Sequence, residues 1–197
     1  ITSKDIADMW IHEAFTNYSE VLFTECEFGL KAGQEYAIGL RHNIVNDKPI
    51  IGEYHVHDQG SGDMYYKGSN MLHTIRQIVN DDEKFRLMLR EMNDLFYHQT
   101  VTSEEVETFI NEFFNISFDV VFDQYLRTVD VPAFEYKIEE DSLKYRWSNC
   151  VEGFDMSFRN SKDVLFKCTT NWTVIDMEND ILEYLPNDNF YIQKRKI

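Results

Sequence analysis

Residues 10–20 carry the first side chains whose types and spacing could do chemistry. His12 and Glu13 form the pair that opens the helical zinc motif H-E-x-x-H, in which a second histidine follows one turn later. Thr16 stands at that later position, so the segment is not such a zinc site by itself. Taken alone, Glu13 is best explained as a polar residue of an amphipathic helix. A second segment is needed to give it a function.

Two further segments hold reactive side chains. An extended backbone would place the imidazoles of His55 and His57 on one side, as a metal pair requires. A polar loop is the favoured explanation of these two histidines. The other segment, residues 63–68, follows a glycine-rich stretch and contains the adjacent tyrosines Tyr65 and Tyr66.

The composition is that of a folded, acidic protein. The 197 residues are 43% hydrophobic and 15% aromatic, which supplies a core that a disordered chain lacks. Acidic side chains number 35 and basic ones 19, which gives a net charge of −16. Such a surface repels phosphate groups, so nonspecific nucleic-acid binding is excluded and anionic membranes are disfavoured. No apolar run approaches the roughly 20 residues that span a bilayer, and we expect no membrane segment.

Helical periodicity dominates the part of the chain that must position these side chains. The pattern predicts helices at residues 4–26, 34–46, 64–79, 82–98, 102–114 and 119–127, with a loop at residues 50–62. Thr102 and Glu105 have the spacing of a capping box at the start of the fifth helix. Ser117 is the expected cap of the sixth.

After Val131 and Pro132 the hydrophobic period changes to two, which is typical of strands. Strands are predicted at residues 134–138, 143–147, 164–170, 172–175 and 190–194. Their spacing favours a small antiparallel β-sandwich. We therefore predict a segregated α+β fold, with an all-helical subdomain at residues 1–130 and a β-sandwich domain at residues 131–197. The second part holds 12 acidic and 9 basic side chains, so the first holds 23 and 10 and carries a net charge of −13.

The residues around Glu13 and Tyr65 together resemble the aminopeptidase N and leukotriene hydrolase family of zinc metallopeptidases, which are gluzincins. One family motif is close to W-x-x-E-G/A-F-A/T-x-Y-x-E. The matching residues here are Trp10, Glu13, Ala14, Phe15, Thr16, Tyr18 and Glu20. A second motif, Y-D/E-K-G, is matched by Tyr65, Lys67 and Gly68, with Tyr66 in place of the acid. Two motifs in the family's order are more specific than either one.

The resemblance implies a fold and a set of roles. Residues 1–130 correspond to the helical C-terminal part of a thermolysin-like catalytic domain, and a small β-sandwich follows in many members. Glu13 matches the third zinc ligand. Tyr65 matches the tyrosine whose hydroxyl donates a hydrogen bond where negative charge develops on the scissile carbonyl oxygen. Because the family removes N-terminal residues from peptides, zinc is the implied cofactor and a peptide the implied substrate of the full-length protein.

Three neighbouring residues are candidates for supporting the zinc ligand or contacting substrate: His12, Glu20 and Tyr66. Glu20 lies two turns after Glu13 on the same helical face, where a solvated acid is the favoured explanation. His12 points about 100° away from Glu13 around the helix, which favours packing over metal binding. The family pattern selects Tyr65 as the catalytic tyrosine and leaves Tyr66 as a core aromatic.

The resemblance also places part of the site outside this chain. The second zinc histidine falls about seven residues before Ile1, together with the first histidine and the general-base glutamate. A start at Ile1 rather than Met leads us to expect a piece of a longer protein. One carboxylate cannot hold a catalytic zinc, which needs about three protein ligands. The isolated chain is therefore expected to bind no catalytic zinc and to be inactive.

Two other functions remain for comparison. The alternative is a non-catalytic relative that keeps the fold as a peptide-binding or scaffolding module, and an intact upstream H-E-x-x-H would distinguish the enzyme from it. Epoxide hydrolysis is disfavoured, because leukotriene hydrolases carry a helical C-terminal domain where this chain has predicted strands.

The three cysteines, Cys26, Cys150 and Cys168, lack C-x-x-C spacing. We therefore predict neither a disulfide framework nor a cysteine zinc site. We expect a soluble protein whose periplasmic or secreted location depends on an upstream signal peptide. The sequence leaves the preferred P1 residue and the oligomeric state open.

Overall fold

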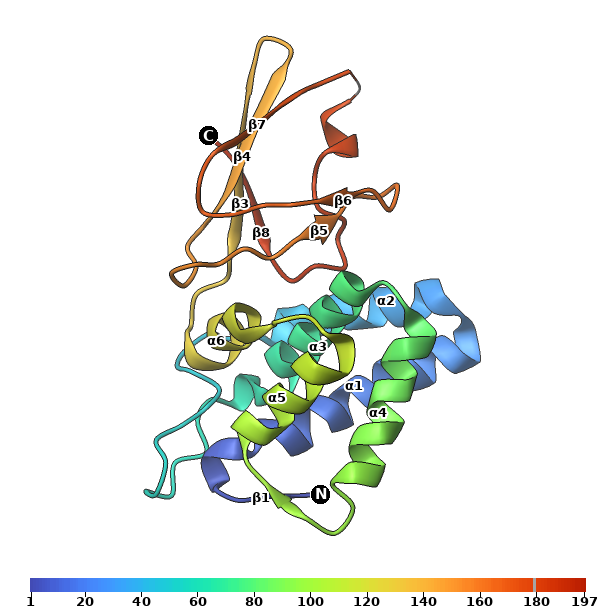
Figure 1. Ribbon diagram of the computed structural model, residues 1–197, viewed down its shortest axis with the longest axis vertical. Coiled ribbons are helices and arrows are strands. Elements are labelled where there is room, and N and C mark those ends of the chain that lie inside the picture. The colour runs from blue at the N-terminus through green and yellow to red at the C-terminus, as the bar shows by residue number, and fades with distance from the viewer. Residues whose placement is uncertain (179) are drawn as a thin grey trace.

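The computed structural model describes residues 1–178 and 180–197. Its N-terminal part is helical, as Figure 1 shows. The helices are α1 Trp10–Phe28, α2 Leu30–Gly39, α3 Tyr66–Val79, α4 Asp82–Leu95, α5 Ser103–Phe114 and α6 Asp119–Arg127. Short 3-10 turns flank them: η1 Ile6–Asp8, η2 Leu40–Asn43, η3 Gly62–Met64 and, in the C-terminal part, η4 Ile181–Glu183.

Strands dominate the C-terminal part. They are β3 Ala133–Glu139, β4 Ser142–Ser148, β5 Phe158–Arg159, β6 Leu165–Phe166, β7 Thr173–Asp176 and β8 Gln193–Lys196, and β1 Thr2–Ser3 pairs with β2 Thr100–Val101 in the helical part. The main sheet has the order β7-β4-β3-β8, and β5 pairs with β6. A helical part followed by a strand-rich part confirms the predicted segregated α+β fold class, whereas the β-sandwich arrangement of the strands stays a prediction.

The pairing of β8 corrects one detail of that prediction. β8 runs parallel to β3, whereas β3–β4 and β4–β7 are antiparallel. The sheet is therefore mixed rather than purely antiparallel, because the chain reaches the β3 edge of the sheet from the end at which β3 itself begins. Among the described residues, the strands outside this sheet and the short β1–β2 pair are β5 and β6, which are two residues each.

Local signals explain most helix boundaries. Thr102 and Glu105 form the predicted capping box at α5, with both reciprocal hydrogen bonds present. The N-cap of α6 is Phe118 rather than Ser117, whose hydroxyl donates to Asp119 inside the helix. Gly29, with φ of +93°, ends α1, and α2 begins at the next residue, earlier than the periodicity indicated.

α3 is the central helix of the molecule. It contacts α1, α2, α4 and α6, as Figure 1 shows. Every residue from Lys67 to Arg76 is buried, which is unusual for a helix with this many polar side chains. These polar side chains must therefore find partners inside the protein.

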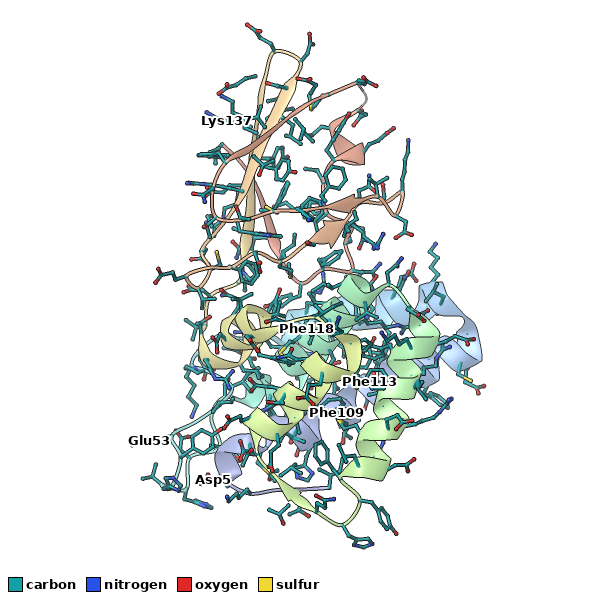
Figure 2. The ribbon with its side chains drawn as sticks, in the orientation of Figure 1. Asp5, Glu53, Phe109, Phe113, Phe118 and Lys137 are labelled. Atoms are coloured by element: carbon teal, nitrogen blue, oxygen red, sulfur yellow. The ribbon has the colours of Figure 1, made fainter. Side chains whose placement is uncertain are left out.

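Aromatic side chains fill the rest of the core. Phe109, Phe113 and Phe118 follow one another along α5 and the loop to α6, as Figure 2 shows, and neighbouring phenylalanine rings lie 5.1–6.4 Å apart. In the strand part, Phe158 of β5 packs 5.0 Å from Phe134 of β3, measured between ring centroids. The hydrophobic core runs from one part into the other.

Hydrogen bonds also join the two parts. The Tyr125 hydroxyl of α6 donates to the backbone oxygen of Tyr191, at 2.6 Å. Arg41 of η2 donates to the backbone oxygens of Asp188 and Asn189. Among the described residues, no helix is both long and apolar enough to cross a membrane.

Candidate active-site face

α1 and α3 approach closely where the two sequence motifs meet. A Cβ placed on Gly68 would lie 2.7 Å from the Cβ of Ala14, so only glycine allows the present distance between the helices. Ala14 follows Glu13 directly, and Gly68 comes three residues after Tyr65. The small residues of the two motifs therefore set how closely α1 and α3 can approach beside Glu13 and Tyr65.

Glu13 and Tyr65 meet at this contact. Glu13 is half-buried in the first turn of α1, and Tyr65 is the N-cap residue of α3, with 41% of its side chain exposed. Partial burial raises the pKa of the Tyr65 phenol, and the charge and hydrogen bonding of the Glu13 carboxylate raise it further. Because the pKa lies above its usual value near 10, the phenol is a hydrogen-bond donor at neutral pH.

The other predicted residues lie around this pair. Exposed Glu20 accepts a hydrogen bond of 2.8 Å from the hydroxyl of Tyr36 in α2, which raises the pKa of Tyr36. Half-buried Tyr66 lies beside Tyr65, with ring centroids 6.3 Å apart. His12 accepts a hydrogen bond from the backbone N–H of Ser3, so its ring is held by the N-terminal strand rather than by Glu13.

The His55 and His57 loop lies against the N-terminal turn. The backbone N–H of His55 donates to the Asp5 carboxylate at 3.0 Å, and Figure 2 shows Asp5 and Glu53 in this region. His55 has φ of +68°, so the backbone is not the extended one that would align the two imidazoles. The structure thus fits the polar-loop interpretation of this pair.

Asp63 and Asn17 escaped the sequence reasoning, which named Lys67 as a motif residue but did not predict that it is buried. Asp63 and Lys67 are almost fully buried on either side of Tyr65, and Asn17, one turn after Glu13, is 7% exposed. The Asn17 Oδ1 atom has no hydrogen-bond partner among the described residues. Asp63 and Lys67 each lie two residues from Tyr65, and this spacing was the available signal. Charged side chains near a helix start normally indicate a solvated face, so burial was not expected.

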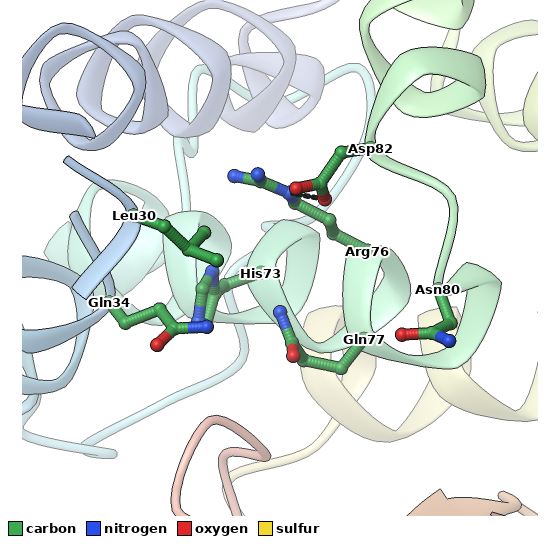
Figure 3. A pocket seen from close by; sticks show the side chains of 7 residues that line it. All are labelled: Leu30, Gln34, His73, Arg76, Gln77, Asn80 and Asp82. Atoms are coloured by element: carbon green, nitrogen blue, oxygen red, sulfur yellow. Dashed lines mark hydrogen bonds and ion pairs between the residues drawn. The ribbon is translucent and has the colours of Figure 1, made fainter. Parts of the chain in front are cut away.

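A polar cavity of about 290 Å³ lies at the opposite end of α3, beside α2 and the start of α4. Figure 3 shows Arg76 and Asp82 joined across it, with His73 and Gln34 nearby. Both nitrogens of His73 are engaged, by the Tyr18 hydroxyl and the Asn189 side chain. The charged and imidazole groups of this cavity already have protein partners, which suits a structural network.

Among the described residues, possible metal ligands are not gathered into a complete site. In the part of the chain that the structure describes, no three His, Cys, Asp or Glu side chains are grouped to hold a metal. Glu13 is a half-buried carboxylate close enough to Tyr65 to raise the pKa of its phenol, so it suits one ligand position. The described residues do not supply the others.

Comparisons with known proteins bear on the fold. No protein-family model matches the sequence. The M1 zinc metallopeptidase from Deinococcus radiodurans matches 64% of this chain with a TM-score of 0.52 and 21% identity. A mutant of that enzyme bound to a Tyr-Ser-Ala substrate matches 62% with a TM-score of 0.51 and 21% identity. The chain spans 28–29% of the length of these structures, and it shares the fold of part of the M1 zinc metallopeptidases.

Proposed function

We propose that this chain is part of a zinc-dependent aminopeptidase that hydrolyses N-terminal residues from peptides. The observation that carries the proposal is the meeting of Glu13 and Tyr65 at the Ala14–Gly68 contact. The fold shared with M1 zinc metallopeptidases supports it, and one of these structures holds a Tyr-Ser-Ala substrate.

Glu13 is assigned as one zinc ligand, with the other ligands outside this chain. When bound, zinc polarises a carbonyl group and lowers the pKa of its water. Tyr65 is assigned as the donor to the carbonyl oxygen of the substrate. Its raised pKa keeps the proton on the phenol, so the donor is present throughout the neutral pH range.

The test uses the full-length protein with an aminoacyl reporter substrate. Tyr65→Phe is expected to lower kcat about 10²–10³-fold with zinc content unchanged, as removal of an oxyanion donor does. Glu13→Ala is expected to lower both zinc content, measured by elemental analysis, and activity.

Matched controls are Tyr97→Phe and Glu91→Ala, which change exposed residues on and just after α4. An unchanged kcat in the Tyr65→Phe variant of an active protein would contradict the role assigned to Tyr65. Peptide binding without any hydrolysis would support the scaffolding alternative. For the chain of 197 residues alone, stoichiometric zinc that Glu13→Ala removes would contradict the expected inactive piece.

A further inference from the structure

The segment that carries Tyr65 is buried on either side of an exposed tyrosine. Asp63 is 3% exposed and Lys67 is 1% exposed, whereas Tyr65 between them is 41% exposed. An exposed phenol has few packing contacts of its own to fix its position. Its place therefore depends on how the backbone on either side is held.

Asp63 holds the segment on one side. Its two carboxylate oxygens accept hydrogen bonds from the backbone N–H groups of Val45 and Asn46, at 2.9 and 2.6 Å. Hydrogen bonds to a carboxylate are among the stronger ones in proteins. This ties η3 to the chain that follows η2.

Lys67 holds the segment on the other side. Its Nζ atom donates to the backbone oxygen of Thr128, at 2.8 Å. Thr128 is the C-cap residue of α6, where an ammonium also meets the negative end of the helix dipole. The first turn of α3 is thereby fixed to the end of α6.

Stability alone does not explain a lysine at this position. Among the described residues, the ion pairs of lysines within 4.0 Å all belong to other lysines, and the Thr128 oxygen is the hydrogen-bond partner of the Lys67 ammonium. Burial lowers the pKa of Lys67 to about 8, against the opposing charges of Asp63 and Asp130. A buried cation without an ion pair is costly, and apolar residues of similar volume are often at least as stable.

We propose that Asp63 and Lys67 are positioning residues that hold the Tyr65 phenol against the Glu13 carboxylate. The two anchors lie on different elements, so together they fix both the position and the direction of the backbone at Tyr65. The placement can be tested in the chain itself. Its effect on catalysis rests on the proposed function.

The first experiment measures the contact between Tyr65 and Glu13 by NMR at pH 7. In the chain with ¹³C-labelled tyrosine, Tyr65→Phe identifies the Tyr65 resonance. Glu13→Gln is expected to shift that resonance, and the shift is expected to disappear in Lys67→Met and to shrink in Asp63→Asn. An undiminished shift in either folded variant would overturn the role of that residue.

Tyr125→Phe is the control for loss of a buried hydrogen bond elsewhere, because it removes the bond to Tyr191. It is expected to keep the full Tyr65 shift. Thermal unfolding is followed for every variant, and Lys67→Met is expected to melt no lower than the wild type at pH 7. A large fall in its Tm would assign Lys67 a purely structural role.

The second experiment uses the full-length protein and a double-mutant cycle. Lys67→Met is expected to lower kcat up to about 100-fold with little change in KM, the cost of a misplaced catalytic group. In the Tyr65→Phe background it is expected to have no further effect on kcat. An equal further loss in that background would contradict positioning through Tyr65. A wild-type protein without activity would remove the proposed function, whereas the NMR result would still decide the placement.

Discussion

The two ends of α3 hold polar clusters of opposite character. At the C-terminal end, Arg76 donates to Glu25, to Asp82 and to the Tyr18 hydroxyl, and His73 has a partner on each nitrogen. At the N-terminal end, Tyr65 is exposed and Lys67 has one hydrogen bond. One helix thus carries a saturated network and an unsaturated one.

The difference shows which cluster is available for chemistry. A saturated buried network stabilises a fold but has no free donor or acceptor for a ligand. A polar cavity of about 290 Å³ lies at the saturated end, and the motif residues lie at the unsaturated end. Unused hydrogen-bonding capacity therefore favours the end that carries the motif residues as the proposed site.

The largest expected loss of stability comes from a substitution in the saturated network at the C-terminal end of α3. Arg76→Met removes a buried cation that pairs with Glu25 and Asp82, and we expect unfolding free energy to fall by about 3–5 kcal/mol, as for other broken buried pairs. Urea unfolding measures the change. Arg90→Met, at an exposed arginine of α4, is the control and should change stability by less than about 0.5 kcal/mol. Equal losses for both variants would contradict the contrast.

Acid pH should act on the same end. Burial lowers the pKa of His73 to about 4, from 6.5 in the unfolded chain. The unfolded state then binds more protons between these values, so stability is full above pH 6.5 and falls as the pH drops to 4. This group contributes a loss of roughly 3 kcal/mol. Urea unfolding at pH 6.5 and pH 4 measures the loss of unfolding free energy on acidification. In His73→Gln this loss should be smaller than in the wild type by roughly 3 kcal/mol. Equal losses in the two proteins would place His73 outside the acid response.

Gly68→Ala tests the contact between the two helices. Its Cβ would meet Ala14 at 2.7 Å, and we expect a net cost of about 1–3 kcal/mol from overpacking, reduced by the better helix propensity of alanine. A Cβ on Gly62 meets nothing within 4 Å, so Gly62→Ala is the matched control. Thermal unfolding compares them, and a Gly68→Ala protein as stable as its control would show that the helices can separate freely.

The smallest expected change in stability comes from removing the Tyr65 hydroxyl, and it tests the contrast between the two ends of α3 directly. Tyr65→Phe removes an exposed hydroxyl and should change unfolding free energy by less than about 0.5 kcal/mol. Tyr18→Phe removes a buried hydroxyl that contacts His73 and Arg76, and it should cost about 1 kcal/mol or more. The order is checked by urea unfolding of the two single variants, and the reverse order would contradict our assignment of the two ends.

Local patterns predicted much of the fold. Helices α3, α4 and α5 and the hairpin of β3 with β4 follow the predicted ranges closely. Helical and strand periodicity reflect which face of an element is buried. The capping box at Thr102 depends on residues three apart and was predicted from them. The prediction of a purely antiparallel arrangement was wrong for β8, because strand direction depends on the path of the chain over many residues.

The sequence by itself determined the identity and spacing of Glu13 and Tyr65, the two halves of the fold and the acidic charge of the helical part. Only the tertiary structure decided that these two residues meet, because the approach depends on Ala14 and Gly68 packing across two helices. It also decided that Asp63 and Lys67 are buried, since a charge is buried only when distant backbone groups supply its partners. Neighbouring residues determine helix and strand preferences, whereas the surroundings of a buried side chain depend on residues from the whole chain.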